Sequence, residues 1–186
     1  MKKAIWILVF AIPLLLAGCI PFSLYPIYTV DTLLFEPALV GWWAKPDAQE
    51  VYVFSADGEK SYELTLLTME EDTKHFEAHL ADIGGTTFLD LYPEKKAFED
   101  SDYSGHSIPV HSFYVVEQFE PTLKILPIEM DWFGAYLKDH PDAIEYGIIG
   151  DKCVVTAPTE KVQAFLSRIL EDGVVYYNTE EFERIK

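Results

Sequence analysis

Two histidines and a glutamate alternate with apolar residues in His75-Phe-Glu-Ala-His79. Imidazole and carboxylate groups are common metal ligands, but Glu77 follows His75 by two residues, which differs from the His-Glu-x-x-His of zinc proteases. The alternation predicts a strand with His75, Glu77 and His79 on one face, where the two imidazoles lie ~13 Å apart. The two histidines are therefore too far apart to share one metal ion, although a neighbouring pair could share one with help from another strand. We favour the alternative, in which this face of an antiparallel sheet is solvated.

A second group of candidate metal ligands is acidic. The segment Asp100-Ser-Asp-Tyr-Ser-Gly105 has oxygen ligands at alternate positions and a glycine at the sixth, as in the first half of a calcium loop. The second half fails, because the twelfth position is His111 instead of glutamate. We expect a solvated acidic loop, with a weak calcium site at Asp100, Asp102 and His111 as the alternative.

Asp90 occupies an unusual position in the apolar stretch Phe88-Leu-Asp-Leu-Tyr92. If Phe88, Asp90 and Tyr92 face inward, a carboxylate lies inside the fold, and these residues with Trp43 could line a cavity for an apolar ligand. If the two leucines form the core face, Asp90 lies in water. We favour the second arrangement, and we expect most of the 12 Phe, 11 Tyr and 4 Trp to fill the core.

The sequence offers little support for an enzyme. There is no Gly-x-Ser-x-Gly, Cys-x-x-Cys or phosphate-binding glycine loop. A catalytic group of His79, His111 and Asp90 remains a third, weaker interpretation. Cys153 lies in an apolar stretch and is expected to be a buried core residue. No catalytic residue and no non-covalent cofactor is predicted.

Alternating apolar residues and short turns predict an antiparallel meander of eight strands that forms a barrel or a strongly curved sheet. The expected strands are 38–45, 49–55, 61–69, 74–82, 86–92, 110–119, 122–128 and 152–157. Asp57-Gly58 and Gly84-Gly85 supply hairpin turns. Two helices, at about 131–139 and 159–172, flank the sheet, so the fold class is mainly β with some α.

Composition limits the class of protein. The chain has 186 residues, of which 49% are hydrophobic, and a net charge of −17. This apolar content is sufficient for a packed core, which excludes disorder. The acidic balance argues against nucleic-acid binding, which depends on clustered Lys and Arg.

The N-terminus has the pattern of a secretory signal. Lys2 and Lys3 precede an uncharged run from Ala4 to Leu16, which is too short to span a bilayer comfortably, and Leu16-Ala17-Gly18-Cys19 follows. This last motif resembles the lipobox of bacterial lipoproteins. The resemblance implies that diacylglycerol is attached to Cys19, that residues 1–18 are removed, and that the new amino group is acylated.

We therefore expect a tether at 19–36, a single β-rich domain at 37–186, and anchoring to a membrane outside the cytoplasm. Ile20 follows the cysteine where Asp would signal retention, so the outer membrane and periplasm are the expected location in a Gram-negative host.

Two further resemblances concern the domain. Gly41-Trp42-Trp43 resembles the Gly-x-Trp of lipocalins, a family in which the Trp closes one end of an eight-stranded barrel and packs on an Arg of the last strand. We expect neither Arg168 nor Arg184 to lie in a last barrel strand, which departs from that pattern. Much of 30–170 resembles a family of uncharacterised bacterial lipoproteins, in motifs that include Pro37-Ala-Leu-Val-Gly-Trp42, Glu77-Ala-His-Leu80, Phe88-Leu-Asp-Leu-Tyr-Pro93, Pro109-Val-His111 and Gln163-Ala-Phe-Leu166. No activity transfers from that family.

The expected function is a non-enzymatic binding or scaffolding lipoprotein that contacts another protein of the cell envelope, or a cation. A lipocalin-like carrier of a small hydrophobic ligand is the alternative. A binding protein needs an exposed apolar surface, a carrier needs an enclosed apolar cavity, and an enzyme needs polar groups that converge in a cleft.

Overall fold

The computed structural model describes residues 21–46, 50–68, 73–94, 108–149 and 152–186. The lipobox residues Leu16, Ala17, Gly18 and Cys19 lie outside the described residues, as do Asp100 and Asp102. The predictions of a lipidated cysteine and of a calcium loop therefore stay predictions.

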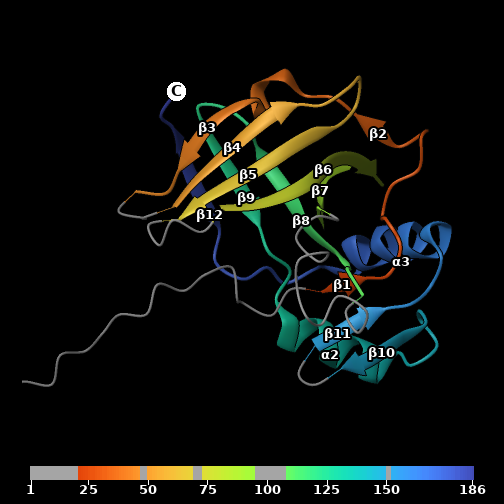
Figure 1. Ribbon diagram of the computed structural model, residues 1–186. Coiled ribbons are helices and arrows are strands. Elements are labelled where there is room, and N and C mark those ends of the chain that lie inside the picture. Colours follow the sequence, from red (N-terminus) through yellow and green to blue (C-terminus); the bar gives the residue numbers. More distant parts are fainter. Residues whose placement is uncertain (1–20, 47–49, 69–72, 95–107, 150–151) are drawn as a thin grey trace, which may run out of the picture.

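The main element is a closed barrel of eight antiparallel strands, which confirms the predicted fold class (Figure 1). Each strand pairs with the next around the ring, and the pairing of β8 with β9 completes it. In ring order the strands are β3 (Gly41–Ala44), β4 (Glu50–Ala56), β5 (Tyr62–Thr68), β6 (Thr73–Ile83), β7 (Thr86–Pro93), β8 (His111–Gln118), β9 (Thr122–Leu126) and β12 (Glu180–Arg184).

The eighth barrel strand is not the one predicted. We expected 152–157, but β11 (Lys152–Val155) lies outside the barrel, where it pairs with β10 (Tyr146–Ile149) and β1 (Phe22–Ser23). The barrel is closed by β12, which pairs with β3 and β9. In β12 the inward face offers one large apolar residue, Phe182, among charged neighbours, so its alternation gives a weak signal.

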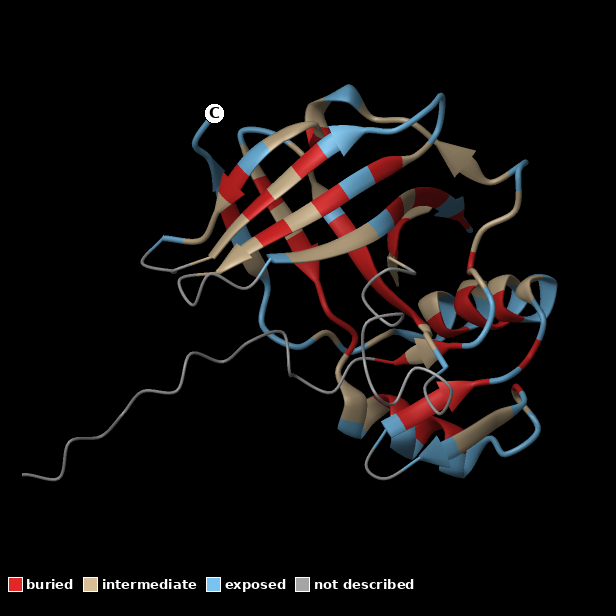
Figure 2. Ribbon diagram, viewed as in Figure 1, coloured by how far each residue is buried: buried red, intermediate tan, exposed pale blue. Residues whose placement is uncertain are grey.

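Two hydrophobic cores share the wall formed by β6, β7 and β8 (Figure 2). Inward residues of these strands, such as Leu89 and Tyr114, belong to the core inside the barrel. Outward residues, such as Phe88 and Phe113, belong to a second core outside it. Alternate residues of a strand point to opposite faces, so strands buried on both faces carry apolar residues at nearly every position.

The second core is covered by α2 (Met130–Asp139), α3 (Thr159–Asp172) and β11. The predicted helices at 131–139 and 159–172 are confirmed to within a residue. Pro158 precedes the first turn of α3, and Gly173 ends it with a φ of 93°, a left-handed conformation that glycine adopts without steric cost. Within the described residues, no helix has the length and apolar character needed to cross a membrane.

One end of the barrel is closed around Trp43, which is fully buried. Its indole N–H donates to the Leu39 carbonyl in the short helix η1 (Pro37–Leu39) at 2.8 Å. Arg184 of β12 lies over the Trp43 ring at 4.2 Å and donates to the carbonyls of Val40 and Ala38 at 2.8 and 2.5 Å. The expectation that Arg184 lies outside the last barrel strand is therefore wrong. The Trp–Arg contact that the Gly-x-Trp resemblance implies is present.

The segment expected to be a tether is part of the folded domain. Phe22 and Ser23 form β1, which lies between β8 and β11, and Leu33 and Leu34 form β2, which pairs with β6. Ile27 between them is fully buried. Residues 21–36 therefore pack against both hydrophobic cores and are not an extended linker.

Candidate functional site

A cluster of polar side chains lies on the outer face of the barrel, at β6, β7 and β8. Asp90 is fully buried, and its Oδ1 lies 2.7 Å from Nδ1 of His111, which is 7% exposed. The carboxylate accepts this hydrogen bond from the ring nitrogen. His79 is the direct cross-strand partner of Asp90 in the β6–β7 ladder. The Cβ atoms of such paired residues lie about 5 Å apart. The structure therefore brings together the three residues of the enzymatic interpretation.

Our preference for placing Asp90 in water was wrong, although its neighbours Leu89 and Leu91 do face the barrel core. Asp90 points outward, but the N-terminal segment covers it. Its Oδ2 accepts from the backbone N–H of Ile27 at 3.0 Å. The segment is held from the other side by α3, where Gln163 donates to the Ile27 carbonyl at 3.0 Å. One carboxylate thus joins the N-terminal segment to both β7 and β8.

The rim of the cluster is half-buried. The rings of Tyr28 and His79 stack with 4.3 Å between their centroids. The ring centroids of Tyr92 and His111 are 4.5 Å apart. Burial, with the negative charges of Asp90 and Glu77, raises the pKa of Tyr28 to about 12. Burial also lowers the pKa of His79, against the opposing effect of Asp90. At neutral pH the rim therefore presents a protonated phenol and a neutral imidazole.

Among the described residues, no nucleophile is paired with a histidine of this cluster. Within the described segments, no hydroxyl or thiol side chain donates a hydrogen bond to His79 or His111, as an activated nucleophile would. Cys153 is buried, and desolvation raises its pKa to about 11. Each oxygen of the Asp90 carboxylate accepts one hydrogen bond, Oδ1 from His111 and Oδ2 from Ile27. The arrangement fastens β7, β8 and the N-terminal segment to one another, which is a structural role.

The predicted metal ligands are spread over the sheet. His75 lies on the outer face of β6, where its ring contacts Glu63 at 3.2 Å and both side chains are well exposed, as expected for a solvated face. Glu77 is exposed on the same strand. Among the residues that the structure describes, no three His, Cys, Asp or Glu side chains are grouped as a metal site would require.

The four residues expected to line a ligand cavity do not share one. Trp43 closes the barrel, whereas Phe88, Asp90 and Tyr92 lie on its outer face. Inside the barrel, the described residues border a hollow of about 20 Å³, which is lined by Tyr52, Phe54, Leu64, Leu89, Leu91, Tyr114, Ile125, Glu180 and Phe182. That volume has room for about one water molecule.

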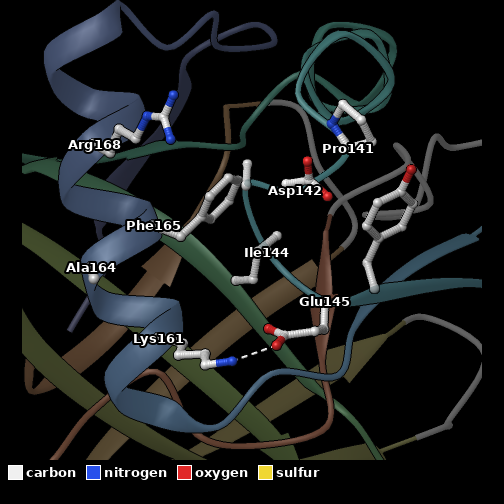
Figure 3. Close-up of a pocket in the computed structure, with 10 residues that line it drawn as sticks. Pro141, Asp142, Ile144, Glu145, Lys161, Ala164, Phe165 and Arg168 are labelled. Atoms are coloured by element: carbon white, nitrogen blue, oxygen red, sulfur yellow. Dashed lines mark hydrogen bonds and ion pairs between the residues drawn. The ribbon is translucent and has the colours of Figure 1, made fainter.

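The larger hollow lies outside the barrel, between α3 and the segment 141–146 (Figure 3). It is an open groove of about 700 Å³. Phe165 and Ile144, both nearly buried, face each other across it, and the exposed Ala164 lies beside them on α3. A small side chain at 164 leaves the helix surface open at this point.

Charged side chains border the groove. On α3, Lys161 and Arg168 are separated by two helical turns and lie on the same side as Phe165. Lys161 forms an ion pair with Glu145 across the groove, and this hydrogen bond lowers the pKa of Glu145. Nε of Arg168 lies 3.8 Å from Oδ2 of Asp172, one turn further along α3. Both pairs are exposed and contribute little to stability, so these charges are available to a bound partner.

Sequence reasoning did not identify this groove. The spacing of Lys161, Ala164 and Arg168 on a helix was readable and places them on one side of it. The opposite wall, which includes Ile144 and Glu145, carries no motif. Only the packing of the 141–146 segment against α3 forms the hollow.

Comparisons with protein-family models, curated proteins and solved structures find no match for this chain. The candidate site therefore rests on its own geometry.

Proposed function

We propose that this chain is a lipid-anchored protein outside the cytoplasm that binds a segment of another envelope protein in the groove beside α3. The observation that carries the proposal is the contrast between the two hollows. The hollow that the described residues border inside the barrel measures about 20 Å³, and the groove outside it about 700 Å³. Small-molecule pockets usually measure ~300–1,000 Å³, so the groove has the size for a ligand and the hollow inside the barrel does not.

Anchoring is supported by the basic start, the apolar run and the Leu16-Ala17-Gly18-Cys19 motif. The position of this motif also suits the fold. Pro21 is already buried, and Phe22 begins the first strand, so cleavage before Cys19 would leave the folded domain intact. Diacylglycerol with an N-linked acyl chain would supply more than one lipid chain, which is the requirement for stable membrane attachment.

A protein segment suits the groove better than a small apolar ligand. The floor is lined by Phe165 and Ile144, which are 3% and 6% exposed and offer little apolar surface to a ligand. The border carries charges of both signs, Lys161 and Arg168 against Glu145 and Asp142. The groove is open to solvent, and the Lys161–Glu145 ion pair crosses it. A carrier site would enclose its ligand and bury most of the ligand's surface.

Lipid attachment is tested by replacing Cys19. The wild-type chain should incorporate labelled fatty acid and sediment with membranes. Cys19→Ser should lose the label and accumulate as the uncleaved precursor. Cys153→Ser is the matched control, because it removes the other cysteine and should retain the label. Labelling that survives Cys19→Ser would contradict the lipobox interpretation.

The groove is tested by introducing a photo-cross-linking amino acid at Ala164 in the anchored protein, with Glu59 in the β4–β5 turn as the control position. We expect a discrete cross-linked protein from position 164 and none from position 59. The cross-link should be lost when Arg168→Glu is added. Equal cross-linking from both positions would refute the groove as the binding site.

Native mass spectrometry of a soluble form beginning at Ile20 tests the carrier alternative. We expect the bare protein mass. A co-purifying adduct of several hundred daltons that survives filling of the groove by Ala164→Trp would place a ligand elsewhere and contradict the proposal.

A further inference from the structure

Two large apolar side chains are exposed next to each other at the end of β10. Ile148 is 64% exposed and Ile149 is 68% exposed. Both lie at the end of β10, where Ile148 pairs with Cys153 and Ile149 with Lys152. Removing these two side chains from water would be favourable, so the end of β10 is suited to contact with another apolar surface.

The first strand begins beside this hairpin. β1 runs parallel to β11, with Phe22 opposite Val154, so the N-terminal ends of β1 and β11 lie at the same end of the sheet. β11 begins at Lys152, which pairs with Ile149 at the end of β10. The ammonium of Lys152 lies 5.3 Å from the centre of the Phe22 ring.

Covalent geometry then limits the position of the lipid. Cys19 is three residues before Phe22, and three residues span at most about 11 Å. Phe22 is separated from β10 by one strand, and neighbouring strands lie about 5 Å apart. Lipid chains on Cys19 would therefore enter the bilayer within a short distance of Ile148 and Ile149.

The charges of the hairpin agree with this placement. The chain as a whole is strongly acidic, but β10 and β11 contain no Asp or Glu and have one charged residue, the exposed Lys152. Asp151, which stands between the two strands in the sequence, lies outside the described residues. A long basic side chain can keep its ammonium among lipid headgroups while its methylenes lie on apolar surface. Most other faces of so acidic a protein would be repelled by an anionic membrane.

We propose that the end of the β10–β11 hairpin, through Ile148 and Ile149, rests in the surface of the bilayer to which the protein is anchored. This inference rests on the proposed lipidation of Cys19. The lipid fixes one point of the domain, and the hairpin provides a second contact. Two contacts orient the domain, so that the barrel points away from the membrane.

The test uses the lipidated chain in vesicles of phosphatidylethanolamine and phosphatidylglycerol. An environment-sensitive fluorophore is attached at Ile149→Cys, or at Glu59→Cys in the β4–β5 turn as the matched control. Cys153 should stay unlabelled, because it is buried and its pKa is raised to about 11. Flotation of the vesicles first shows whether the protein is anchored.

At position 149 we expect a blue-shifted emission, quenching by spin-labelled acyl chains and protection from aqueous iodide. At position 59 we expect the reverse. If the protein floats but iodide quenches both positions equally, the hairpin is in water and the inference is overturned while anchoring stands. Protection from both quenchers at position 149 would indicate a protein contact and would also overturn it. Failure to float would remove the anchoring proposal and this inference with it.

Discussion

Replacement of Asp90 tests the assignment of a structural role to the buried polar cluster. Asp90→Ala removes the acceptor of two hydrogen bonds, from His111 at 2.7 Å and from the Ile27 backbone at 3.0 Å. Both donors are buried, so water cannot replace the carboxylate without rearrangement. Removing one partner of a buried pair costs about 3–5 kcal/mol, because the other partner stays desolvated. We expect a loss of that size in the free energy of unfolding.

Urea unfolding of a soluble form beginning at Ile20 measures this loss. With a denaturant slope of about 2 kcal/mol per molar, the midpoint should fall by about 1.5–2.5 M. Asp90→Asn should lose less than Asp90→Ala. Its side-chain carbonyl can still accept from Ile27, so one of the two hydrogen bonds is kept.

The surface pair His75–Glu63 is the matched control. It joins the same two types of group at 3.2 Å, but the side chains are 39% and 48% exposed. Such a pair contributes about 0–1 kcal/mol, so Glu63→Ala should change the midpoint only slightly. If Asp90→Ala destabilised the protein no more than Glu63→Ala, the structural role of the cluster would be refuted, and a role in binding or catalysis would have to be reconsidered.

Three further predictions concern single side chains. Arg184→Ala should lower the free energy of unfolding by about 2 kcal/mol in urea titrations followed by tryptophan fluorescence, because the contact with Trp43 and two hydrogen bonds are lost; Arg184→Lys should recover only part of it. Burial lowers the pKa of His79 below 6.5, so the unfolded chain binds a proton there at a higher pH than the folded one. The folded protein should therefore lose stability as the pH falls from about 7.5 to 5.5, and less so in His79→Gln. Native Cys153 should not react with thiol reagents at pH 8 until urea unfolds the chain.

Each of these has a contrary outcome. Wild-type stability in Arg184→Ala would mean that the barrel end is closed by other contacts. An unchanged pH dependence in His79→Gln would assign the effect to another histidine. Rapid labelling of Cys153 in the folded protein would show that β11 opens readily.

Much of the fold was readable from the sequence. Alternation in β4 to β9 predicts antiparallel strands, and the apolar face of α3 between Pro158 and Gly173 predicts a helix. These signals are local, because the period of two or of 3.6 residues is set by backbone geometry. The closing strand β12 was missed for a related reason. One inward apolar residue, Phe182, is enough when seven other strands already form the barrel, and such a strand has almost no periodic signal.

The sequence by itself determined that the N-terminus has the pattern of a secretory signal and that the domain is a β-rich meander. It could not decide which outward strand faces would be covered by other elements of the fold. Asp90 is an outward residue of β7, and alternation alone places an outward carboxylate in water. Only the tertiary structure places Ile27 and His111 over it and buries it. The same holds for Arg184 over Trp43 and for the groove beside α3, because contacts between residues distant in sequence leave no local period to read.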